Sequence, residues 1–185
     1  MKKRMSTSIA FIKNLFTTGA ITESSEETAK EVCKYLPKEE GKVIVEFGMG
    51  HGNITREILN CISSTSKVYA FEVNDDFCAY VNKSIDDKRL IIINDGAENL
   101  NNHVMEEVHA VVGSIPYSFF SKEKQFQIIQ GAYDGLAKNA YYSQILYSKL
   151  NFKKFQSIFN HCILTTTRNI PKGYIYHCKK EFHQT

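Results

Sequence analysis

The segment from residue 43 to residue 53 constrains the fold of this chain more than any other. It reads Val43-Ile-Val-Glu-Phe-Gly-Met-Gly-His-Gly-Asn53, an apolar run typical of a buried strand that continues into glycine at every second position. Glycine lets a backbone turn sharply and bring its N–H groups close to a ligand. A helix predicted to begin near Ile54 adds the favourable polarity of its N-terminus. The segment therefore predicts a strand, a nucleotide-cofactor turn and a helix.

A second apolar strand is predicted at Val68–Phe71, and it ends at Glu72. An acid that follows the second strand, about twenty residues after a glycine turn, is placed to accept hydrogen bonds from ribose hydroxyls. The spacing therefore predicts a cofactor that contains adenosine.

The glycine spacing separates two classes of cofactor turn. Dinucleotide-binding folds have G-x-G-x-x-G, whereas this chain has E-x-G-x-G-x-G, with Glu46 before the first glycine. That form resembles motif I of class I methyltransferases, which use S-adenosylmethionine. A Rossmann-like domain that binds another nucleotide, or none, is the alternative.

Further segments match this family in the right order, and the resemblance implies a role for each. Glu72 matches the ribose-binding acid, and Asp95-Gly96-Ala97 matches the loop that holds the adenine. Gly113-Ser-Ile-Pro-Tyr117 matches motif IV, at the methyl-transfer site. The cofactor-binding residues that the resemblance implies are Thr18, Gly19, Glu46, Phe47, Gly48, Gly50, Gly52, Asn53, Glu72, Val73, Asp95, Gly96, Ala97 and Gly113.

The hydrophobic pattern alternates between strands and helices, which favours a parallel α/β sheet. After a helix capped by Ser24 or Ser25 that ends before Pro37, we predict strands at 43–47, 68–71, 90–93, 110–112, 141–147, 158–165 and 174–178, and helices at 54–61, 76–83, 98–106, 122–136 and 150–157. The expected fold is a single Rossmann-like domain with a mostly parallel seven-stranded sheet, helices on both faces and an antiparallel C-terminal hairpin.

The beginning of the chain has an amphipathic pattern. Met5, Ile9, Ile12 and Phe16 recur at helical spacing beside basic residues, a composition typical of a helix at a membrane interface. We therefore divide the chain into N-terminal helices at 1–37, for membrane contact and cofactor cover, and a methyltransferase domain at 38–185. Packing of the first helix on its own domain is the alternative.

Charge is unevenly distributed, although the formal net charge is only +3. Residues 1–22 contain no acid, and the stretch after Asp134 carries eight basic residues and the single acid Glu181. This asymmetry indicates an anionic partner, either lipid headgroups or nucleic acid. Solvated lysines without a partner are the alternative for the C-terminal set.

Cysteines and histidines show no ligand pattern. The five cysteines are scattered without C-x-x-C spacing, and the histidines lack H-E-x-x-H spacing, so we expect reduced thiols and no metal site. No apolar run has the length of a bilayer span, and the start Met1-Lys-Lys-Arg4 is not followed by the apolar region of a signal peptide. The expected location is cytoplasmic, with peripheral contact to the inner membrane surface as one alternative.

Motif IV bears on the methyl acceptor. Ser114-Ile-Pro-Tyr117 resembles the N-L-P-Y of ribosomal RNA adenine dimethylases, but serine offers no amide pair for a purine amino edge. The motif is closer to the S-L-P of bacterial phospholipid N-methyltransferases. Similarity to that family continues in Phe16-Thr-Thr-Gly-Ala20, Gln144-Ile-Leu-Tyr-Ser148, Asn151-Phe-Lys-Lys-Phe155 and Asn169-Ile-Pro-Lys-Gly-Tyr174.

The second resemblance implies an enzyme that methylates the amine of phosphatidylethanolamine or a related phospholipid. The acceptor-site candidates are Ser114, Pro116, Tyr117 and Tyr147. An aromatic face stabilises a cationic, increasingly methylated nitrogen, whereas core packing is the alternative role for the two tyrosines. Two alternative hypotheses remain. One is a methyltransferase that acts on nucleic acid or small molecules, and the other is a cofactor-binding protein without catalysis.

Overall fold

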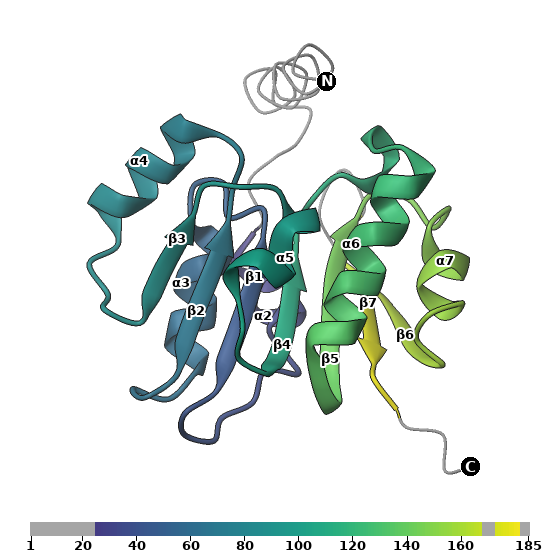
Figure 1. The fold of residues 1–185 in the computed structure, drawn as a ribbon, viewed down its shortest axis with the longest axis horizontal. Coiled ribbons are helices and arrows are strands. Elements are labelled where there is room, and N and C mark those ends of the chain that lie inside the picture. Colours follow the sequence, from purple (N-terminus) through teal and green to yellow (C-terminus); the bar gives the residue numbers. More distant parts are fainter. Residues whose placement is uncertain (1–24, 168–172, 182–185) are drawn as a thin grey trace.

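The computed structural model describes residues 25–167 and 173–181, which form a seven-stranded sheet with helices on both faces (Figure 1). The strands are β1 (Val43–Phe47), β2 (Lys67–Phe71), β3 (Leu90–Ile93), β4 (Val108–Gly113), β5 (Leu136–Leu146), β6 (His161–Thr166) and β7 (Tyr174–Lys179). Their order across the sheet is β3-β2-β1-β4-β5-β7-β6. All pairs from β3 to β5 are parallel, and β7 is antiparallel to both of its neighbours. The predicted fold class is confirmed.

β1 lies at the centre of the sheet because its side chains are apolar on both faces. Ile44 packs with one helical layer, and Val45 and Phe47 pack with the other. Every residue of β1 is buried, as expected for a parallel strand covered on both sides. The turn that follows β1 is therefore anchored by a rigid strand.

One face of the sheet is covered by α2 (Glu26–Val32), α3 (Asn53–Cys61) and α4 (Asp75–Ser84). Ser25 is the N-cap of α2, as predicted, and its hydroxyl accepts from the Thr28 amide at 3.3 Å. The Asn74 side chain caps α4 in the same way through the Asp76 amide. Such caps satisfy amides that have no partner within the helix and set where each helix begins.

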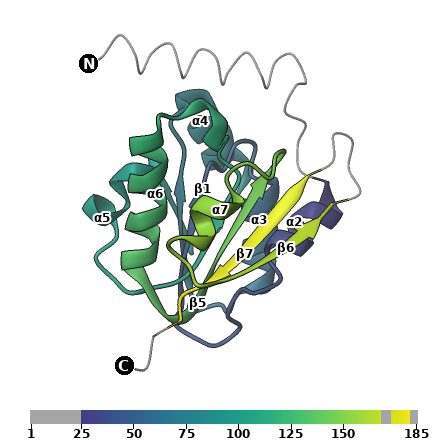
Figure 2. The ribbon, with the colours of Figure 1, turned by 90° about the vertical axis from the view of Figure 1, so that its right-hand side faces the viewer.

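The opposite face is covered by a second set of helices, which Figure 2 shows from the side of the hairpin. They are the short 3-10 helices η1 (Ala97–Asn99) and η2 (Tyr117–Phe119) and the α-helices α5 (Leu100–His103), α6 (Lys122–Gly135) and α7 (Phe152–Gln156). Buried residues of α6 and the aromatic side chains Phe155 and Phe159 pack together against the strands. This layer contains most of the buried aromatic rings.

The C-terminal hairpin corrects the prediction that all cysteines are free thiols. Cys162 on β6 and Cys178 on β7 form a disulfide, while Cys33, Cys61 and Cys78 are free. The two bonded residues are direct partners in the β6–β7 register, with Cα atoms 4.1 Å apart. Sequence spacing alone does not reveal which residues a hairpin brings opposite each other, so the pair was missed.

Several predicted boundaries were wrong by a few residues. The predicted helix 98–106 is shorter, since the Val104 amide bonds back to the Leu100 carbonyl and the chain then turns into β4. β5 begins at Leu136, before the predicted 141, and its pairing with β4 shifts register between Val108 and Ala110. The predicted start of the sixth strand at 158 was also early, because the amides of Ile158 and Phe159 bond to Phe155.

The predicted amphipathic helix of residues 5–16 lies outside the described residues, and the domain boundary at residue 37 stays a prediction. In the ranges 25–167 and 173–181, no helix combines the length and the apolar character that a membrane crossing requires.

Candidate functional site

The predicted site residues gather at one edge of the sheet. Asp95, Glu72, the glycine turn and Ser114 follow β3, β2, β1 and β4, and these strands are consecutive in the sheet. Because the strands are parallel, their carboxyl ends meet at the same edge. Tyr147 follows β5, which is the next strand along. Residues from more than half of the chain therefore lie along the carboxyl edge of the sheet.

The glycine turn has the backbone geometry that its sequence predicts. Gly48, Gly50 and Gly52 all have positive φ, at 80°, 51° and 81°, where residues with a Cβ are strained. The Gly48 amide donates to Phe71 at 2.8 Å, which ties the turn to the end of β2. A Cβ on Gly50 would meet no atom of the described residues within 4 Å, so these residues leave space for a ligand beside this backbone.

Glu72 joins the second strand to the glycine turn. Its carboxylate accepts from the Gly50 amide at 3.1 Å and from the Asn74 amide at 2.9 Å. Burial raises the pKa of Glu72, and the two amides oppose that rise. A carboxylate offers about four lone-pair sites, so these two bonds orient the group and leave acceptor capacity for ribose hydroxyls.

Glu46 is an almost fully buried carboxyl group beneath the glycine turn. Its Oε2 accepts from the Thr55 hydroxyl at 2.7 Å, but its Oε1 has no hydrogen-bond partner among the described residues. Burial raises the pKa of Glu46 to about 8. An acceptor left without a partner in the interior is costly, and a cationic or hydrogen-bond-donating ligand group would relieve that cost.

Asp95 begins the predicted adenine loop and is held by three donors. Its carboxylate bonds to the Gly96 amide, to Asn99 and to His103 at 2.7, 2.8 and 2.8 Å. Burial raises the pKa of Asp95, but these bonds outweigh it, so the pKa is lower than usual. The loop therefore presents an oriented, ionised carboxylate.

Motif IV lies against the glycine turn, as the resemblance implies. The Ser114 hydroxyl donates to the Gly48 carbonyl at 2.6 Å, and the Ser114 amide donates to Phe47 at 2.9 Å. The two turns are so close that a Cβ on Gly48 would lie 2.8 Å from a methyl carbon of Ile115. A group bound along the glycine turn is thus next to motif IV.

Tyr117 does not point to an open acceptor pocket in this structure. It is fully buried, and its ring packs edge to face on Phe120 and Phe155. Its hydroxyl shares a 2.8 Å hydrogen bond with Tyr142, and burial raises its pKa well above the usual value. The position agrees with core packing, the alternative role for this residue, and it anchors the last residue of motif IV in the core.

Tyr147 is 41% exposed at the end of β5, whereas Pro116 is partly buried within motif IV. Thr18 and Gly19 lie outside the described residues. The remaining cofactor candidates are Phe47 at the end of β1, Asn53 at the start of α3, Val73 beside Glu72, Gly96 and Ala97 around η1, and Gly113 at the end of β4.

Sequence reasoning missed the residues that support the site from below. Gln144 on β5 is fully buried, and its amide group donates to the carbonyl of Ile115 at 3.1 Å and accepts from Tyr142 at 2.9 Å. Thr55 was missed as the partner of Glu46. A buried polar residue within an apolar strand was the available signal for Gln144, because such a group must find partners.

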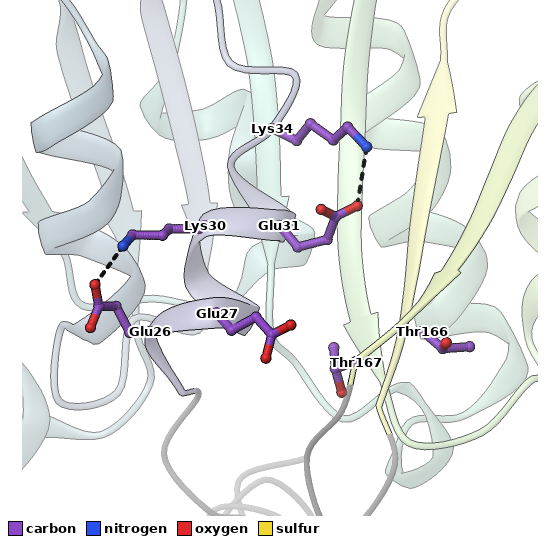
Figure 3. Close-up of a pocket in the computed structure, with 7 residues that line it drawn as sticks. All are labelled: Glu26, Glu27, Lys30, Glu31, Lys34, Thr166 and Thr167. Carbon is purple, nitrogen blue, oxygen red and sulfur yellow. Dashed lines mark hydrogen bonds and ion pairs between the residues drawn. The ribbon is translucent and has the colours of Figure 1, made fainter.

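A cavity of about 640 Å³ lies between α2 and the end of β6. Figure 3 shows its lining, which consists of Glu26, Glu27, Lys30, Glu31, Lys34, Thr166 and Thr167. Lys30 pairs with Glu26 within α2, and Lys34, in the turn after α2, pairs with Glu31. Of the predicted cofactor residues that the structure describes, none lines this cavity, so it is separate from the described part of the glycine-turn site.

The geometry fits an adenosine cofactor with a cationic end. Glu72 and Asp95 present oriented carboxylates after two adjacent strands. Within the described part of the chain, the Gly50 backbone is open and one oxygen of Glu46, below the turn, has no partner. When bound, S-adenosylmethionine supplies an electrophilic methyl group. In the described ranges, no three side chains of His, Cys, Asp or Glu are arranged to hold a metal ion.

Comparison with known proteins identifies the family. Residues 1–146 match the profile of the ribosomal RNA adenine dimethylase family. The ornithine lipid N-methyltransferase of Singulisphaera acidiphila is 23% identical over 176 residues, which cover 91% of this chain and 92% of that protein.

Solved structures share the fold. An rRNA methylase from Streptococcus thermophilus superposes with a TM-score of 0.68 at 17% identity, over 86% of this chain and 98% of that one. A protein from Streptococcus mutans, solved in complex with S-adenosylhomocysteine, gives a TM-score of 0.63 at 18% identity, over 86% and 99% of the two chains. The chain therefore belongs to the ribosomal RNA adenine dimethylase family and is a class I methyltransferase that uses S-adenosylmethionine.

Proposed function

We propose that this enzyme methylates the primary amine of a membrane lipid, phosphatidylethanolamine or another lipid with an amine headgroup. The observation that carries the proposal is the similarity to an ornithine lipid N-methyltransferase, which extends over nine-tenths of both chains. Ser114 supports it, because motif IV has a hydroxyl, already bonded to Gly48, where an adenine site has an amide pair.

We assign the cofactor roles from the positions of these residues along the sheet edge. Glu72 binds the ribose hydroxyls, Asp95 holds the adenine amino group, and the glycine turn lies along the methionine part. Glu46 provides a negative pole beneath the turn when its proton leaves. The bonds that already orient Glu72 and Asp95 support these roles, since a preorganised acceptor loses less freedom on binding.

The acceptor site has to present a neutral amine in line with the methyl group. Reacting atoms in such a displacement need to approach to about 3–3.5 Å. An alkylammonium carries no lone pair for attack, so its proton must leave on or before binding. Desolvation next to a cationic sulfonium favours that loss, because both effects disfavour the charged ammonium.

Motif IV forms one wall of the proposed acceptor site. Ser114 and Pro116 border the amine, and Tyr147 offers an exposed aromatic face to the positive charge that grows with methylation. Tyr117 has a supporting role instead of an acceptor-binding one: it anchors the end of motif IV in the core through its bond to Tyr142. This arrangement supports methyl transfer through positioning and electrostatics, without an identified general base.

Methylation of adenine N6 in RNA is the second candidate. The observation in its favour is the family itself, whose profile matches residues 1–146. The serine in motif IV argues against it, as does the full-length similarity to a lipid enzyme.

One labelling experiment separates the candidates. The purified protein is incubated with S-adenosylmethionine carrying a labelled methyl group, together with lipid extract, RNA or small amines in separate reactions. We expect label in the lipid fraction and, after chromatography, on an amine headgroup. A Glu72→Gln variant is the control and should reduce labelling in every pool. Label confined to RNA would replace the proposal with the second candidate.

A further inference from the structure

Exposed apolar and basic side chains occur together beside the proposed acceptor site. Leu150, just after β5, is 88% exposed, and Phe126 on the first turns of α6 is 52% exposed. Lys122, Lys149 and Lys153 are exposed in the same two segments. We call these five residues the α6–α7 patch.

Side-chain contacts bring the two halves of the patch together. The Lys154 ammonium on α7 bonds to Gln125 on α6, and the rings of Tyr133 and Phe159 are in edge contact at 5.1 Å between centroids. Lys122 and Phe126 are four residues apart and so share one side of the helix. Tyr133 lies on the same side of α6 about two turns later. Because Tyr133 contacts Phe159, just after α7, this side of α6 faces the α7 segment. Figures 1 and 2 both show α6 and α7 as neighbours.

The patch adjoins the carboxyl edge of the sheet. Lys149 and Leu150 follow Tyr147 by two and three residues, and the first turn of α6 follows η2 of motif IV. Gln125 strengthens this link, because its amide donates to the carbonyls of Tyr117 and Phe120 at 2.7 and 2.9 Å. A surface bound to the patch would therefore lie next to the opening for the acceptor.

The α6–α7 patch and its surroundings are mainly positively charged. From residue 135 to residue 180 the sequence contains no acid, so nothing on α7 opposes its lysines. Glu123 is the acid next to Lys122, and the nearby Lys122 and Lys154 contribute to lowering its pKa, after its own amide and Ser121. Lys149 also lies over the Tyr174 ring at 5.2 Å, which holds its charge at the edge of the patch.

We propose that the α6–α7 patch docks the enzyme on an anionic lipid bilayer, with Leu150 and Phe126 inserted among the acyl chains and the three lysines against the headgroups. Apolar burial and attraction of lysines to anionic lipid are the two terms of interfacial binding. RNA would use the lysines but would leave Leu150 in water. The inference rests on the proposed lipid acceptor, because it brings the acceptor opening to the membrane surface.

The protein contains no tryptophan, so a single introduced tryptophan reports on its own position. Leu150→Trp should shift its emission to the blue with vesicles of phosphatidylglycerol and phosphatidylcholine, and brominated acyl chains should quench it. Met105→Trp is the matched control, because Met105 is 82% exposed but precedes β4 at the opposite edge of the sheet. Its emission should not change.

A charge variant tests the electrostatic part. Replacing Lys122, Lys149 and Lys153 by glutamine should weaken partitioning to the same vesicles by about tenfold or more, since each lysine near an anionic surface contributes measurably. The control replaces the remote exposed lysines Lys38, Lys83 and Lys88, which changes net charge equally. Circular dichroism checks that all variants are folded.

The outcomes separate docking from function. Vesicle sedimentation without a shift in Leu150→Trp, an equal shift in Met105→Trp, or a shift with RNA alone would each overturn the docking proposal. The proposed function is tested independently by the labelling of lipid, RNA and amine pools. Labelled lipid without insertion of residue 150 would reject docking alone, and insertion without labelled lipid would reject the proposed acceptor while docking stands.

Discussion

At the scale of single residues, Glu46 is a carboxyl group that is almost fully removed from water. Its carboxyl is buried below the glycine turn, with the Thr55 hydroxyl on one oxygen and no partner among the described residues on the other. Burial raises its pKa to about 8. Near neutral pH the folded protein therefore keeps a proton on this carboxyl that an unfolded chain would lose.

This difference predicts a pH-dependent stability. Between about pH 4.5 and pH 8 the folded chain binds the Glu46 proton and the unfolded chain does not, so stability falls as pH rises. The slope is at most about 1.4 kcal/mol per pH unit. Glu46→Gln removes the titration. Urea unfolding from pH 5 to 8 should show the wild type losing stability relative to the variant, whereas parallel profiles would refute the buried proton.

At the scale of elements, β5 connects the core to motif IV. Alternate residues of this strand face opposite sides of the sheet. On one side Tyr142 and Gln144 form a hydrogen-bonded chain with Tyr117 and Ile115. On the other side Ser143 bonds to the buried His177 at 2.8 Å. One strand therefore contacts the proposed acceptor loop on one side and His177 of β7 on the other.

The two sides of β5 allow a matched test. Gln144→Met removes the donor to Ile115 and the acceptor of Tyr142, so we expect a loss of about 1–3 kcal/mol in stability. Because motif IV then loses its support, kcat should fall about tenfold or more while cofactor affinity stays within about twofold. Ser143→Ala should lose comparable stability with kcat unchanged. An unchanged kcat in Gln144→Met would limit Gln144 to stability.

The β6–β7 hairpin predicts the number of reactive thiols. Cys162 and Cys178 are bonded, and Cys33, Cys61 and Cys78 are free. Protein unfolded without reductant, after purification under oxidising conditions, should react with three equivalents of a thiol reagent, and reduced protein with five. Mass spectrometry of the labelled peptides identifies which residues reacted. Five equivalents in both samples would contradict the bonded pair.

At the scale of the whole molecule, the cofactor edge is assembled from loops after four different strands. A ligand that contacts all of them binds the folded state and not the unfolded chain, which couples binding to global stability. The same loops hold one another in place, through Gly48 to Phe71, Gly50 to Glu72 and Ser114 to Gly48.

Cofactor binding should therefore raise the melting temperature. At a hundredfold excess of S-adenosylhomocysteine over Kd, the stabilisation is about 2.7 kcal/mol, which corresponds to roughly 5–10 °C for a chain of this size. Glu72→Gln should lower the affinity by about tenfold or more and reduce the shift at the same ligand concentration. Differential scanning fluorimetry measures both. Equal shifts in the two proteins would remove Glu72 from the cofactor site.

Local sequence patterns were enough to predict the fold class, the glycine turn and the order of the site loops. These features depend on local chemistry: positive φ demands glycine at 48, 50 and 52, and apolar runs alternating with amphipathic ones demand a covered parallel sheet. Once the strands are parallel, the loops after them must share an edge. The proximity of Glu72, Asp95 and Ser114 could therefore be predicted from the sequence.

Contacts between distant segments could not be predicted from such patterns, because they depend on how the whole chain packs. The pairing of Cys162 with Cys178 depends on hairpin register, and the burial of Tyr117 depends on how α6, α7 and β5 pack around it. Gln144 became a support for motif IV only because the parallel pairing sets it opposite Gly113. Strand register and side-chain packing each depend on many residues that are distant in the sequence, so no local pattern along the chain predicts them.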